Sequence, residues 1–366
     1  MFANIYKGKT VLITGHTGFK GSWLATWLIK LGAKVVGVSN GIPTNPSMFE
    51  IAGIADHMTD TREDIRNLEG IKKIILDIKP DFVFHLAAQA IVSTSYKNPV
   101  DTLETNVMGT ANILEALRNY THPCVAIFIT SDKCYDNVEW IWGYRETDHL
   151  GGKDIYSGSK GAAELVIKSY RHSFFGTTHP VRIGIGRAGN VIGGGDWAID
   201  RLVVDCMCAW NEGRNVEIRS PQATRPWQHV LEPLSGYLRL GQTIFESAER
   251  HGEAYNFGPR AEQNQTVVNL LHDLAQKWGF KNTHDAYLIT DNIPFHEAGL
   301  LKLNCDKALS HLKWESTLGY PETISLISDW YIGYYKAHAD MWNFTLEQIN
   351  TYEQKAVDRN RSWAKS

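Results

Sequence analysis

The chain has 366 residues, with 43% hydrophobic and 21% charged, a composition that excludes disordered and collagen-like chains and suggests about two domains. Its 37 lysines and arginines nearly balance its 40 aspartates and glutamates, and the resulting charge of −3 argues against nucleic acid or an anionic membrane as a partner. Five cysteines do not make a disulfide scaffold, residues 1–9 hold no signal-peptide core and no segment has ~18 uninterrupted apolar residues, so we expect a cytoplasmic protein with reduced thiols.

The first half of the chain alternates short β-branched runs with longer amphipathic stretches. Strands are predicted at Thr10–Thr14, Lys34–Ser39, 81–86, 124–130 and Val181–Arg187. Helices are predicted at 21–31, 100–119 and 158–174. Near-continuous apolar strands separated by helices are typical of a parallel sheet covered on both faces. The expected fold class is therefore α/β, with a Rossmann-type doubly wound parallel sheet.

The second half predicts a smaller, mostly helical C-terminal lobe. Glycine- and proline-rich loops at 189–196 and 219–227 flank a predicted helix at 198–213, and further helices are predicted at 231–251, Val267–Trp278 and 321–341. We assign 1–187 to a dinucleotide-binding domain with a return segment at 228–255, and 188–227 with 256–366 to a substrate lobe. The polar tail after Phe344 is expected to be peripheral.

A glycine-rich turn follows the first predicted strand and reads Gly15-His16-Thr17-Gly18-Phe19-Lys20-Gly21. Such glycines permit a tight turn, a close approach of the backbone to a pyrophosphate, and close packing of helix on strand, although a tight turn needs glycine without a ligand as well. The start of the helix adds amide donors and a favourable dipole. We therefore predict that this turn binds a dinucleotide, with Lys20 either reaching a phosphate or solvated at the helix start.

The end of the second predicted strand is Ser39-Asn40, where many dinucleotide sites place an acid that holds the adenosine ribose. Neither an acid nor an arginine stands there, so this position does not separate NAD from NADP. Asp60 is a candidate for the adenine side of the site. A helix cap ahead of Arg62 explains Asp60 equally well.

A second group of polar residues follows the strand predicted at 124–130. Ser131 stands at the strand end, where ligands of parallel sheets bind, and Tyr156 and Lys160 share one face of the following helix. A lysine ammonium beside a phenol lowers the phenol's pKa from about 10. The phenolate then takes a proton from a substrate hydroxyl during hydride transfer. We predict a redox site here, against the alternative of an ordinary surface pair.

These motifs resemble the short-chain dehydrogenase/reductase superfamily, and the length and added lobe resemble its extended, nucleotide-sugar-modifying members. The resemblance covers most of the chain, and in detail the sequence is similar to the CDP-glucose 4,6-dehydratase family. It rests on the glycine turn, Leu86-Ala87-Ala88, the asparagine of Asn106-Val107-Met108-Gly109-Thr110, Ser131-Asp132-Lys133-Cys134-Tyr135 and the run RAGNVIGGGDW at 187–197. It implies NAD as cofactor, held also by Leu86, Ala87, Ala88 and Asn106, and CDP-glucose as substrate.

The resemblance also implies an internal redox cycle. Tyr156 would take the proton of the 4-hydroxyl during oxidation at carbon 4, a base would then remove the acidified proton at carbon 5, and water would leave from carbon 6 before hydride returns there. We assign Asp132 as the acid for the leaving hydroxyl and Lys133 as the base. The related dTDP- and GDP-sugar dehydratases carry glutamate at the position of Lys133, which is a departure from the wider pattern.

The nucleotide of the substrate is expected in the second lobe. By resemblance, Asn190 contacts the substrate, Arg201 and Arg225 bind the diphosphate, and 216–219 is the short strand beside the base. Trp197 or Trp227 either stacks on the nucleotide or packs the loop against the lobe. His85 and His229 are interpreted as core or supporting histidines, and no cluster has convincing metal-ligand spacing.

Two other functions remain open at this point. A nucleotide-sugar 4-epimerase would use Tyr156 and Lys160 but has no need of Asp132 and Lys133, and a non-catalytic dinucleotide-binding regulator would keep only the glycine turn. The base is named by the resemblance alone, because sequence does not place the backbone groups that recognise cytosine. Helices 100–119 and 158–174 resemble a dimer-forming pair, which predicts a homodimer or homotetramer.

Overall fold

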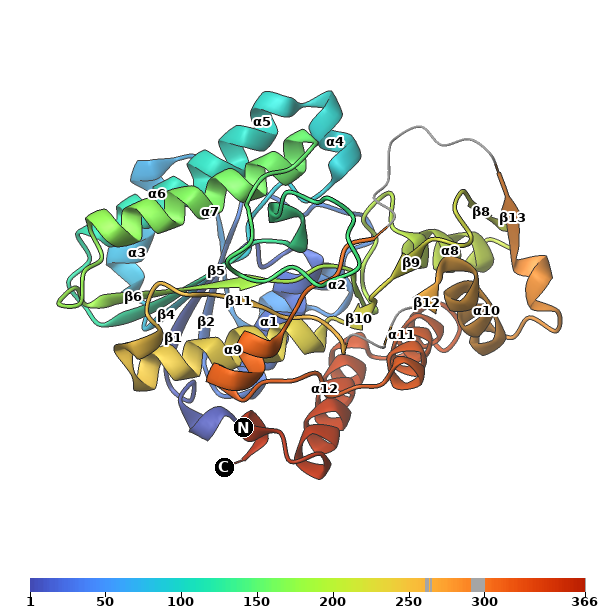
Figure 1. The fold of residues 1–366 in the computed structure, drawn as a ribbon. Helices are drawn as coiled ribbons and strands as arrows, with labels where there is room; N and C mark the ends of the chain where they lie inside the picture. Colours follow the sequence, from blue (N-terminus) through green and yellow to red (C-terminus); the bar gives the residue numbers. More distant parts are fainter. Residues whose placement is uncertain (261–262, 264, 291–299, 366) are drawn as a thin grey trace.

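A seven-stranded sheet forms the centre of the protein (Figure 1). The computed structural model describes residues 1–260, 263, 265–290 and 300–365. All neighbouring strands of this sheet are parallel, in the order β11-β6-β5-β4-β1-β2-β3. The strands are β1 (Thr10–Thr14), β2 (Lys34–Ser39), β3 (Thr59–Arg62), β4 (Phe82–His85), β5 (Cys124–Ile129), β6 (Val181–Arg187) and β11 (Ala254–Asn256). The predicted doubly wound α/β fold is confirmed.

The strand order reverses at β1, which pairs with β2 on one side and β4 on the other. Thr14, its last residue, lies opposite Val38 of β2 and His85 of β4. In a doubly wound sheet such a reversal opens a crevice at the carboxyl ends of the strands, where ligands bind. The glycine turn begins at the next residue, Gly15, and therefore lies at the mouth of that crevice.

Helices cover both faces of the sheet (Figure 1). α3 (Leu68–Ile78), α6 (Gly109–Arg118) and α7 (Ile155–Ser173) pack on one face, and α1 (Phe19–Lys30), α9 (Leu231–Glu246) and α12 (Met341–Asp358) on the other. Because side chains alternate along a strand, Leu12 faces the first group of helices while Val11 and Ile13 face the second. Two buried cores, one on each face, hold the crevice rigid.

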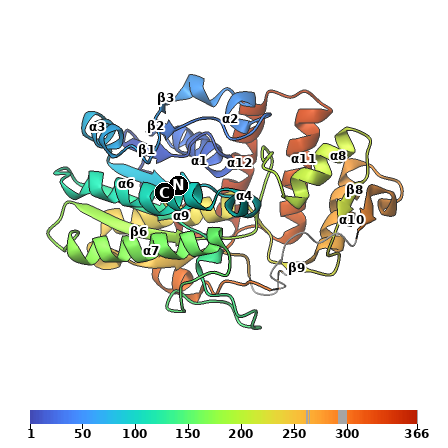
Figure 2. The ribbon, with the colours of Figure 1, turned by 90° about the horizontal axis from the view of Figure 1, so that it is seen from above.

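A smaller lobe lies beside the carboxyl edge of the sheet (Figure 2). It contains α8 (Leu202–Asn211), α10 (Val267–Trp278) and α11 (Tyr320–Tyr335). Short strand pairs brace it: β8 (Val216–Ile218) with β13 (Tyr287–Ile289), β9 (Thr224–Arg225) with β12 (Gln265–Thr266), and β7 (Val191–Ile192) with β10 (Gln228–His229). The chain returns from this lobe to the sheet through α9 and β11, as Figure 1 shows.

Helix boundaries differ from the predicted ones where the backbone changes form. The helix predicted at 100–119 consists of α5 (Pro99–Leu103), a π-helical turn at Glu104–Met108 and α6. The helix predicted at 321–341 ends at Tyr335, because His338 has a φ of 48° and Asp340 caps a new helix. The remaining short helices are α2 (Met48–Ile51) and α4 (Val92–Lys97). Within the residues described, no helix is both long and apolar enough to cross a membrane.

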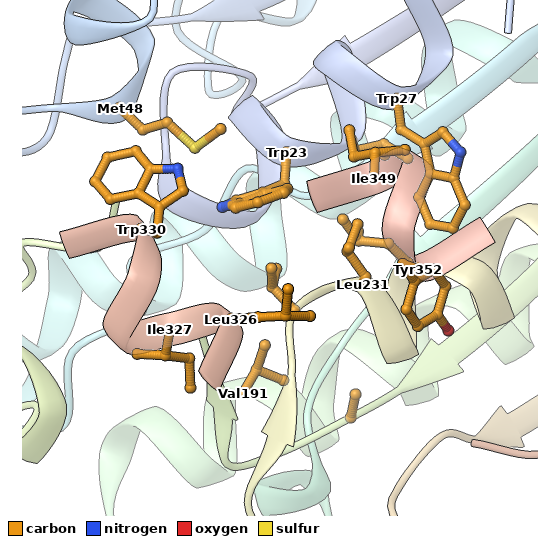
Figure 3. Close-up of a cluster of buried hydrophobic side chains, with 14 of the residues drawn as sticks. Trp23, Trp27, Met48, Val191, Leu231, Leu326, Ile327, Trp330, Ile349 and Tyr352 are labelled. Carbon is orange, nitrogen blue, oxygen red and sulfur yellow. The ribbon is translucent and has the colours of Figure 1, made fainter. Parts of the chain in front are cut away.

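The prediction of a peripheral tail is wrong. Residues 341–358 form α12, which packs on α1 through a buried stripe that recurs every three or four residues; Figure 3 shows Ile349 and Tyr352 of that stripe beside Trp27. Beyond α12, the Trp363 ring stacks on Phe2, with centroids 5.0 Å apart. Most of the polar residues that suggested a peripheral tail form the outer face of an amphipathic helix, and a few lie in its buried stripe.

We expect Trp363→Ala to lower the free energy of unfolding by about 3–5 kcal/mol, because it empties a site where the indole is 1% exposed. Trp142, which is 66% exposed, provides the matched control, and Trp142→Ala is expected to change stability by less than about 0.5 kcal/mol. Guanidinium denaturation followed by fluorescence measures both. Equal losses for the two variants would contradict a structural role for the C-terminal segment.

Candidate active site

A single large cleft of about 1420 Å³ runs along the carboxyl edge of the sheet and into the lobe. Its walls come from the β1–α1 turn, the ends of β4 and β5, the start of α7, and the lobe segments that follow β6. The volume exceeds the ~300–1,000 Å³ of typical small-molecule sites, so it accommodates two ligands of nucleotide size end to end.

The glycine turn forms one wall of this cleft and has no room for a side chain at Gly15 or Gly21. Gly15 has a φ of +75°, and a Cβ there would lie 2.8 Å from the backbone of Ala87. A Cβ on Gly21 would lie 2.1 Å from the carbonyl oxygen of Gly15. Gly18 caps α1 without a side-chain hydrogen bond, so the first-turn amides stay available for an anion. These features fit the pyrophosphate of a dinucleotide.

The other residues of the turn divide between the cleft and the interior. Thr17, Phe19 and Lys20 line the cleft with the three glycines, and the Thr17 hydroxyl lies 2.8 Å from that of Ser39 at the end of β2. His16 points the opposite way: it is fully buried against Gly37, and its Nε2 lies 2.8 Å from Oδ1 of Asp60. Burial lowers the pKa of His16 even though the Asp60 carboxylate opposes that shift.

Asp60 is neither a helix cap nor part of the cleft wall. It lies in β3, where its carboxylate contacts His16 and accepts a hydrogen bond of 2.7 Å from Arg62. The residues that line the cleft directly beyond β3 are Glu63, Asp64, Ile65 and Arg66, which the sequence analysis missed. An acid followed by an apolar residue directly after a strand would have indicated this part of the site. The strand itself, Thr59–Arg62, has no apolar residue, so the sequence pattern did not predict it.

The loop after β4 supplies the facing wall. Leu86, Ala87 and Ala88 line the cleft, as predicted. Asn106, in contrast, is 2% exposed and is not among the lining residues. Asn106 instead accepts a hydrogen bond of 2.8 Å from the Gln89 amide and donates one of 2.8 Å to the Ser159 hydroxyl. Asn106 lies within the π-helical turn before α6, and its two hydrogen bonds connect the loop after β4 to α7.

Three polar residues line the cleft directly after β5. The Ser131 hydroxyl accepts a hydrogen bond of 3.2 Å from the Lys133 amide and donates one of 2.9 Å to the Asp132 carboxylate. Asp132 is 5% exposed and rests directly on Gly189, where an added Cβ would lie 1.8 Å from Oδ2. A hydroxyl, a carboxylate and an amine are thus presented from one short turn.

Tyr156 and Lys160 face the same cleft from α7, with Nζ of Lys160 5.9 Å from the centroid of the Tyr156 ring. Burial raises the pKa of Tyr156 to about 12, although a hydrogen bond with Ser131 opposes the shift. Burial likewise lowers the pKa of Lys160 to about 8. The expectation that Lys160 lowers the pKa of Tyr156 is not met in the protein alone, because the desolvation of the phenol outweighs the available charges.

Lys20 is part of this site rather than a solvated lysine. It lines the cleft, and burial together with Arg201 lowers its pKa to about 8, while Asp132 and Asp196 oppose that shift. The sequence analysis left both interpretations open, because the turn alone does not show which way a helix-start side chain points. Lys20, Lys160 and Arg201 are therefore neighbouring cationic groups in the cleft, close to the buried carboxylates of Asp132 and Asp196.

The lobe contributes Asn190, Trp197, Arg201 and Arg225 to the cleft wall, and Trp227 joins them. Arg201 forms a 3.0 Å ion pair with the buried carboxylate of Asp196, which fixes its guanidinium at the cleft. Trp197 donates a hydrogen bond of 2.9 Å to the Tyr335 hydroxyl and packs against aromatic rings of α11. Packing of the loop on the lobe therefore accounts for most of the Trp197 surface, which is 8% exposed.

Both histidines interpreted as core or supporting residues are buried and neutral. His85 contacts the hydroxyls of Thr14 and Thr110 at 2.7 and 3.1 Å, and burial lowers its pKa to about 3. Burial lowers the pKa of His229 to about 3 as well. Over 1–260, 263, 265–290 and 300–365, no group of three or more His, Cys, Asp or Glu residues is arranged to hold a metal ion.

Comparison with known proteins identifies relatives of the whole chain. A family model described as GDP-mannose 4,6 dehydratase matches residues 12–327. CDP-glucose 4,6-dehydratase of Salmonella typhimurium is 45% identical over 95% of this chain and 97% of its own length, and CDP-paratose 2-epimerase of Salmonella typhi is 32% identical over 87% and 98%. The fold is similar to that of DesIV, a dTDP-glucose 4,6-dehydratase of Streptomyces venezuelae solved with NAD and TYD, with a TM-score of 0.74 at 19% identity over 90% of this chain and 99% of that one.

Gly15→Ala is expected to weaken dinucleotide binding at least about tenfold, because the new methyl group meets the backbone of Ala87. Gly8→Ala is the matched control: Gly8 has nearly the same φ, +73°, but nothing lies within 4 Å of its added Cβ. Both variants carry the cost of a left-handed alanine, about 1–2 kcal/mol, so only the steric contact separates them. Calorimetric titration with dinucleotide measures the difference, and equal affinities would contradict the assigned turn.

Proposed function

Because this chain belongs to the GDP-mannose 4,6-dehydratase family, we propose that it is a hydro-lyase that converts CDP-glucose into CDP-4-keto-6-deoxyglucose. The observation that carries the proposal is the convergence of Ser131, Asp132, Lys133 and Tyr156 on one cleft beside the glycine turn. An alcohol oxidation needs only the hydroxyl and the phenol. The acid and the amine beside them supply the two further proton transfers that an elimination requires.

NAD fits the part of the cleft between the glycine turn and the β4 loop. The turn would hold the pyrophosphate, Leu86–Ala88 would cover the nicotinamide half, and Asp64 with Ile65 would contact the adenine. Glu63, Asp64 and Arg66 line this end, with Arg66 paired to Asp64, and the two carboxylates are suited to accept hydrogen bonds from the adenosine ribose. When bound, NAD supplies the hydride acceptor for carbon 4, the hydride donor for carbon 6, and a positive charge beside Tyr156, with no net consumption.

Oxidation at carbon 4 uses Tyr156 as the base. Its hydroxyl hydrogen-bonds Ser131, and the same serine is oriented by Asp132, so phenol and substrate hydroxyl share one donor–acceptor chain. The protein alone leaves the pKa of Tyr156 at about 12. Deprotonation therefore depends on the cations that gather at this end of the cleft when both ligands are present.

Elimination of water uses the two residues that follow Ser131. Lys133, in its neutral form, removes the proton at carbon 5, which the new carbonyl has acidified. Asp132, in its carboxylic acid form, gives its proton to the hydroxyl on carbon 6, so that the carbon–oxygen bond breaks, water leaves and Asp132 becomes the carboxylate. Gly189 allows this geometry, since any side chain at that position would displace the Asp132 carboxylate.

The lobe would hold the rest of the substrate. Arg201, fixed by Asp196, and Arg225 would bind the diphosphate through guanidinium hydrogen bonds, with Asn190 beside the sugar. We further propose a cytoplasmic homodimer or homotetramer. Exposed apolar side chains on α5, the π-helical turn and α7 support such an interface: Val100, Leu103, Met108, Leu165 and Phe174.

The base would be recognised where α8 and β8 close the far end of the cleft. Asp205 in the first turn of α8 lines this end together with Glu217 and Arg219. Burial raises the pKa of Asp205 to about 6, Asp200 adds to the shift, and Arg219 opposes it. Above that pH its carboxylate accepts a hydrogen bond from the exocyclic amine of cytosine, whereas uracil would place a carbonyl oxygen against the same charge.

Incubation with CDP-glucose and NAD in deuterium oxide tests the proposed reaction. We expect a 4-keto-6-deoxy product carrying solvent deuterium at carbon 5, because the proton removed there exchanges. Lys133→Gln should abolish that incorporation while oxidation at carbon 4 persists. Lys168→Gln is the control with the same chemical change, because Lys168 is an exposed residue farther along α7 and does not line the cleft. An epimerised product without deuterium, or full exchange in Lys133→Gln, would contradict the assignment.

Asp205→Asn is expected to weaken binding of CDP about tenfold and to strengthen binding of UDP, because an amide donates to the uracil carbonyl and loses the charge-assisted bond to cytosine. CDP binding to the unmodified protein should also weaken below about pH 6, as Asp205 becomes protonated, and this dependence should vanish in the variant. Calorimetry with CDP and UDP measures both effects. A swap of preference in Glu217→Gln instead would assign base recognition to β8.

A further inference from the structure

A buried ion pair lies directly behind the catalytic turn and has no part in the mechanism derived above. It joins Glu164 of α7 to Arg187 at the end of β6, with side chains that are 2% and 4% exposed. Nε of Arg187 donates a hydrogen bond of 2.7 Å to Oε1 of Glu164, and a second contact pairs the other two polar ends. Such a pair carries a large desolvation cost, so its presence beside a cleft calls for a functional explanation.

The pair holds the catalytic turn at both of its ends. On one side, the Thr130 hydroxyl, directly before Ser131, donates a hydrogen bond of 2.6 Å to Glu164. On the other, Nη1 of Arg187 donates a hydrogen bond of 2.6 Å to the hydroxyl of Tyr135, which in turn donates one of 2.8 Å to Asn256. The hydrogen bonds of this one ion pair therefore hold the chain on both sides of residues 131–134.

The same pair places a negative charge next to Lys160. Glu164 follows Lys160 by four residues on α7, so the two side chains lie on one face of the helix. The other titratable groups that face Lys160 are Tyr156 on α7, Cys134 on the catalytic turn, His85 on β4 and Lys20 on α1.

Among these groups, Glu164 is the one carboxylate. Burial lowers the pKa of His85 to about 3 and raises that of the Cys134 thiol well above its ordinary value, so both are uncharged. Burial lowers the pKa of Lys160 to about 8, and both the Cys134 thiol and the Glu164 carboxylate oppose that lowering. Because burial keeps the Cys134 thiol uncharged, removal of Glu164 takes away the carboxylate charge that offsets the desolvation of the Lys160 ammonium.

We propose that Glu164 is a positioning residue of the proposed dehydratase: bound to Arg187 and Thr130, it keeps Lys160 cationic beside Tyr156 and fixes the turn that carries Ser131, Asp132 and Lys133. The inference rests on the proposed function for its catalytic consequence. Its electrostatic half concerns the protein alone and is measured without substrate.

Glu164→Gln tests the charge, with Glu164→Asp as the variant that retains it. Labelling of Lys160 by acetic anhydride across pH, quantified by peptide mass spectrometry, reports the ammonium directly. Loss of the carboxylate disfavours the ammonium, so we expect the labelling midpoint to fall by about one pH unit in Glu164→Gln and to stay near the unmodified value in Glu164→Asp. The alkaline limb of kcat should move down with it, since neutral Lys160 no longer supports deprotonation of Tyr156.

Glu146→Gln is the matched control, because Glu146 belongs to the same network without facing Lys160. Its carboxylate accepts a hydrogen bond of 2.8 Å from the Asn256 amide, and it is absent from the groups that shift the pKa of Lys160. Its labelling midpoint should match that of the unmodified protein. A midpoint unchanged in folded Glu164→Gln, or an equal fall in Glu146→Gln, would overturn the proposal.

Thr130→Val tests whether Glu164 fixes the position of the catalytic turn. It also keeps the proposal testable if Glu164→Gln does not fold. It leaves every charge in place and removes only the hydroxyl that ties Glu164 to the catalytic turn. We expect kcat to fall at least about fivefold, with KM and the labelling midpoint unchanged. Unmodified kcat in this variant would overturn the anchoring role. Failure of the proposed function would appear separately, as absence of CDP-glucose turnover in the unmodified protein while the labelling results stand.

Discussion

The parallel pairing of β1 with β2 on one side and β4 on the other is the constraint on which the rest of the site depends. It turns the carboxyl ends of all seven strands toward one edge, so that the segments following β1, β4, β5 and β6 converge although they are far apart in the chain. Each segment then brings one component: the glycine turn, the covering loop, the acid–base residues, and the entry to the lobe. No local feature of these segments would bring them together without the strand order.

Close contacts at two glycines determine how near the converging loops lie to neighbouring side chains. Gly189 lets the backbone after β6 lie against the Asp132 carboxylate, and Gly194 lets the next loop lie against the Trp330 ring of α11, where an added Cβ would be 2.1 Å away. The first contact fixes an acid at the cleft, and the second, near the cluster in Figure 3, docks the lobe on the sheet domain. A larger residue at either position would require its neighbours to move by an ångström or more, which a close-packed interior does not allow. Both contacts therefore depend on glycine.

The sequence was sufficient wherever a residue's role follows from its own segment. Apolar runs predicted five of the seven strands, and the spacing of Tyr156 and Lys160 placed both on one helix face. It failed where burial by distant segments decides the outcome: the direction of Lys20, the role of Asp60 and the pKa of Tyr156 all depend on neighbours many residues away. α12 was missed for a different reason, because its buried stripe is partly polar and includes Thr345, Gln348 and Glu353.

The groups proposed to perform the reaction lie apart from those proposed to recognise the base. Ser131, Tyr156 and Lys160 are tied to the main sheet through the Glu164–Arg187 pair, so a change there disturbs both charge and position. Asp205 lies on α8, beside a strand, β8, that pairs only with β13 among the residues described. Substitutions near Asp205 can therefore alter which base is accepted while leaving the sheet edge intact.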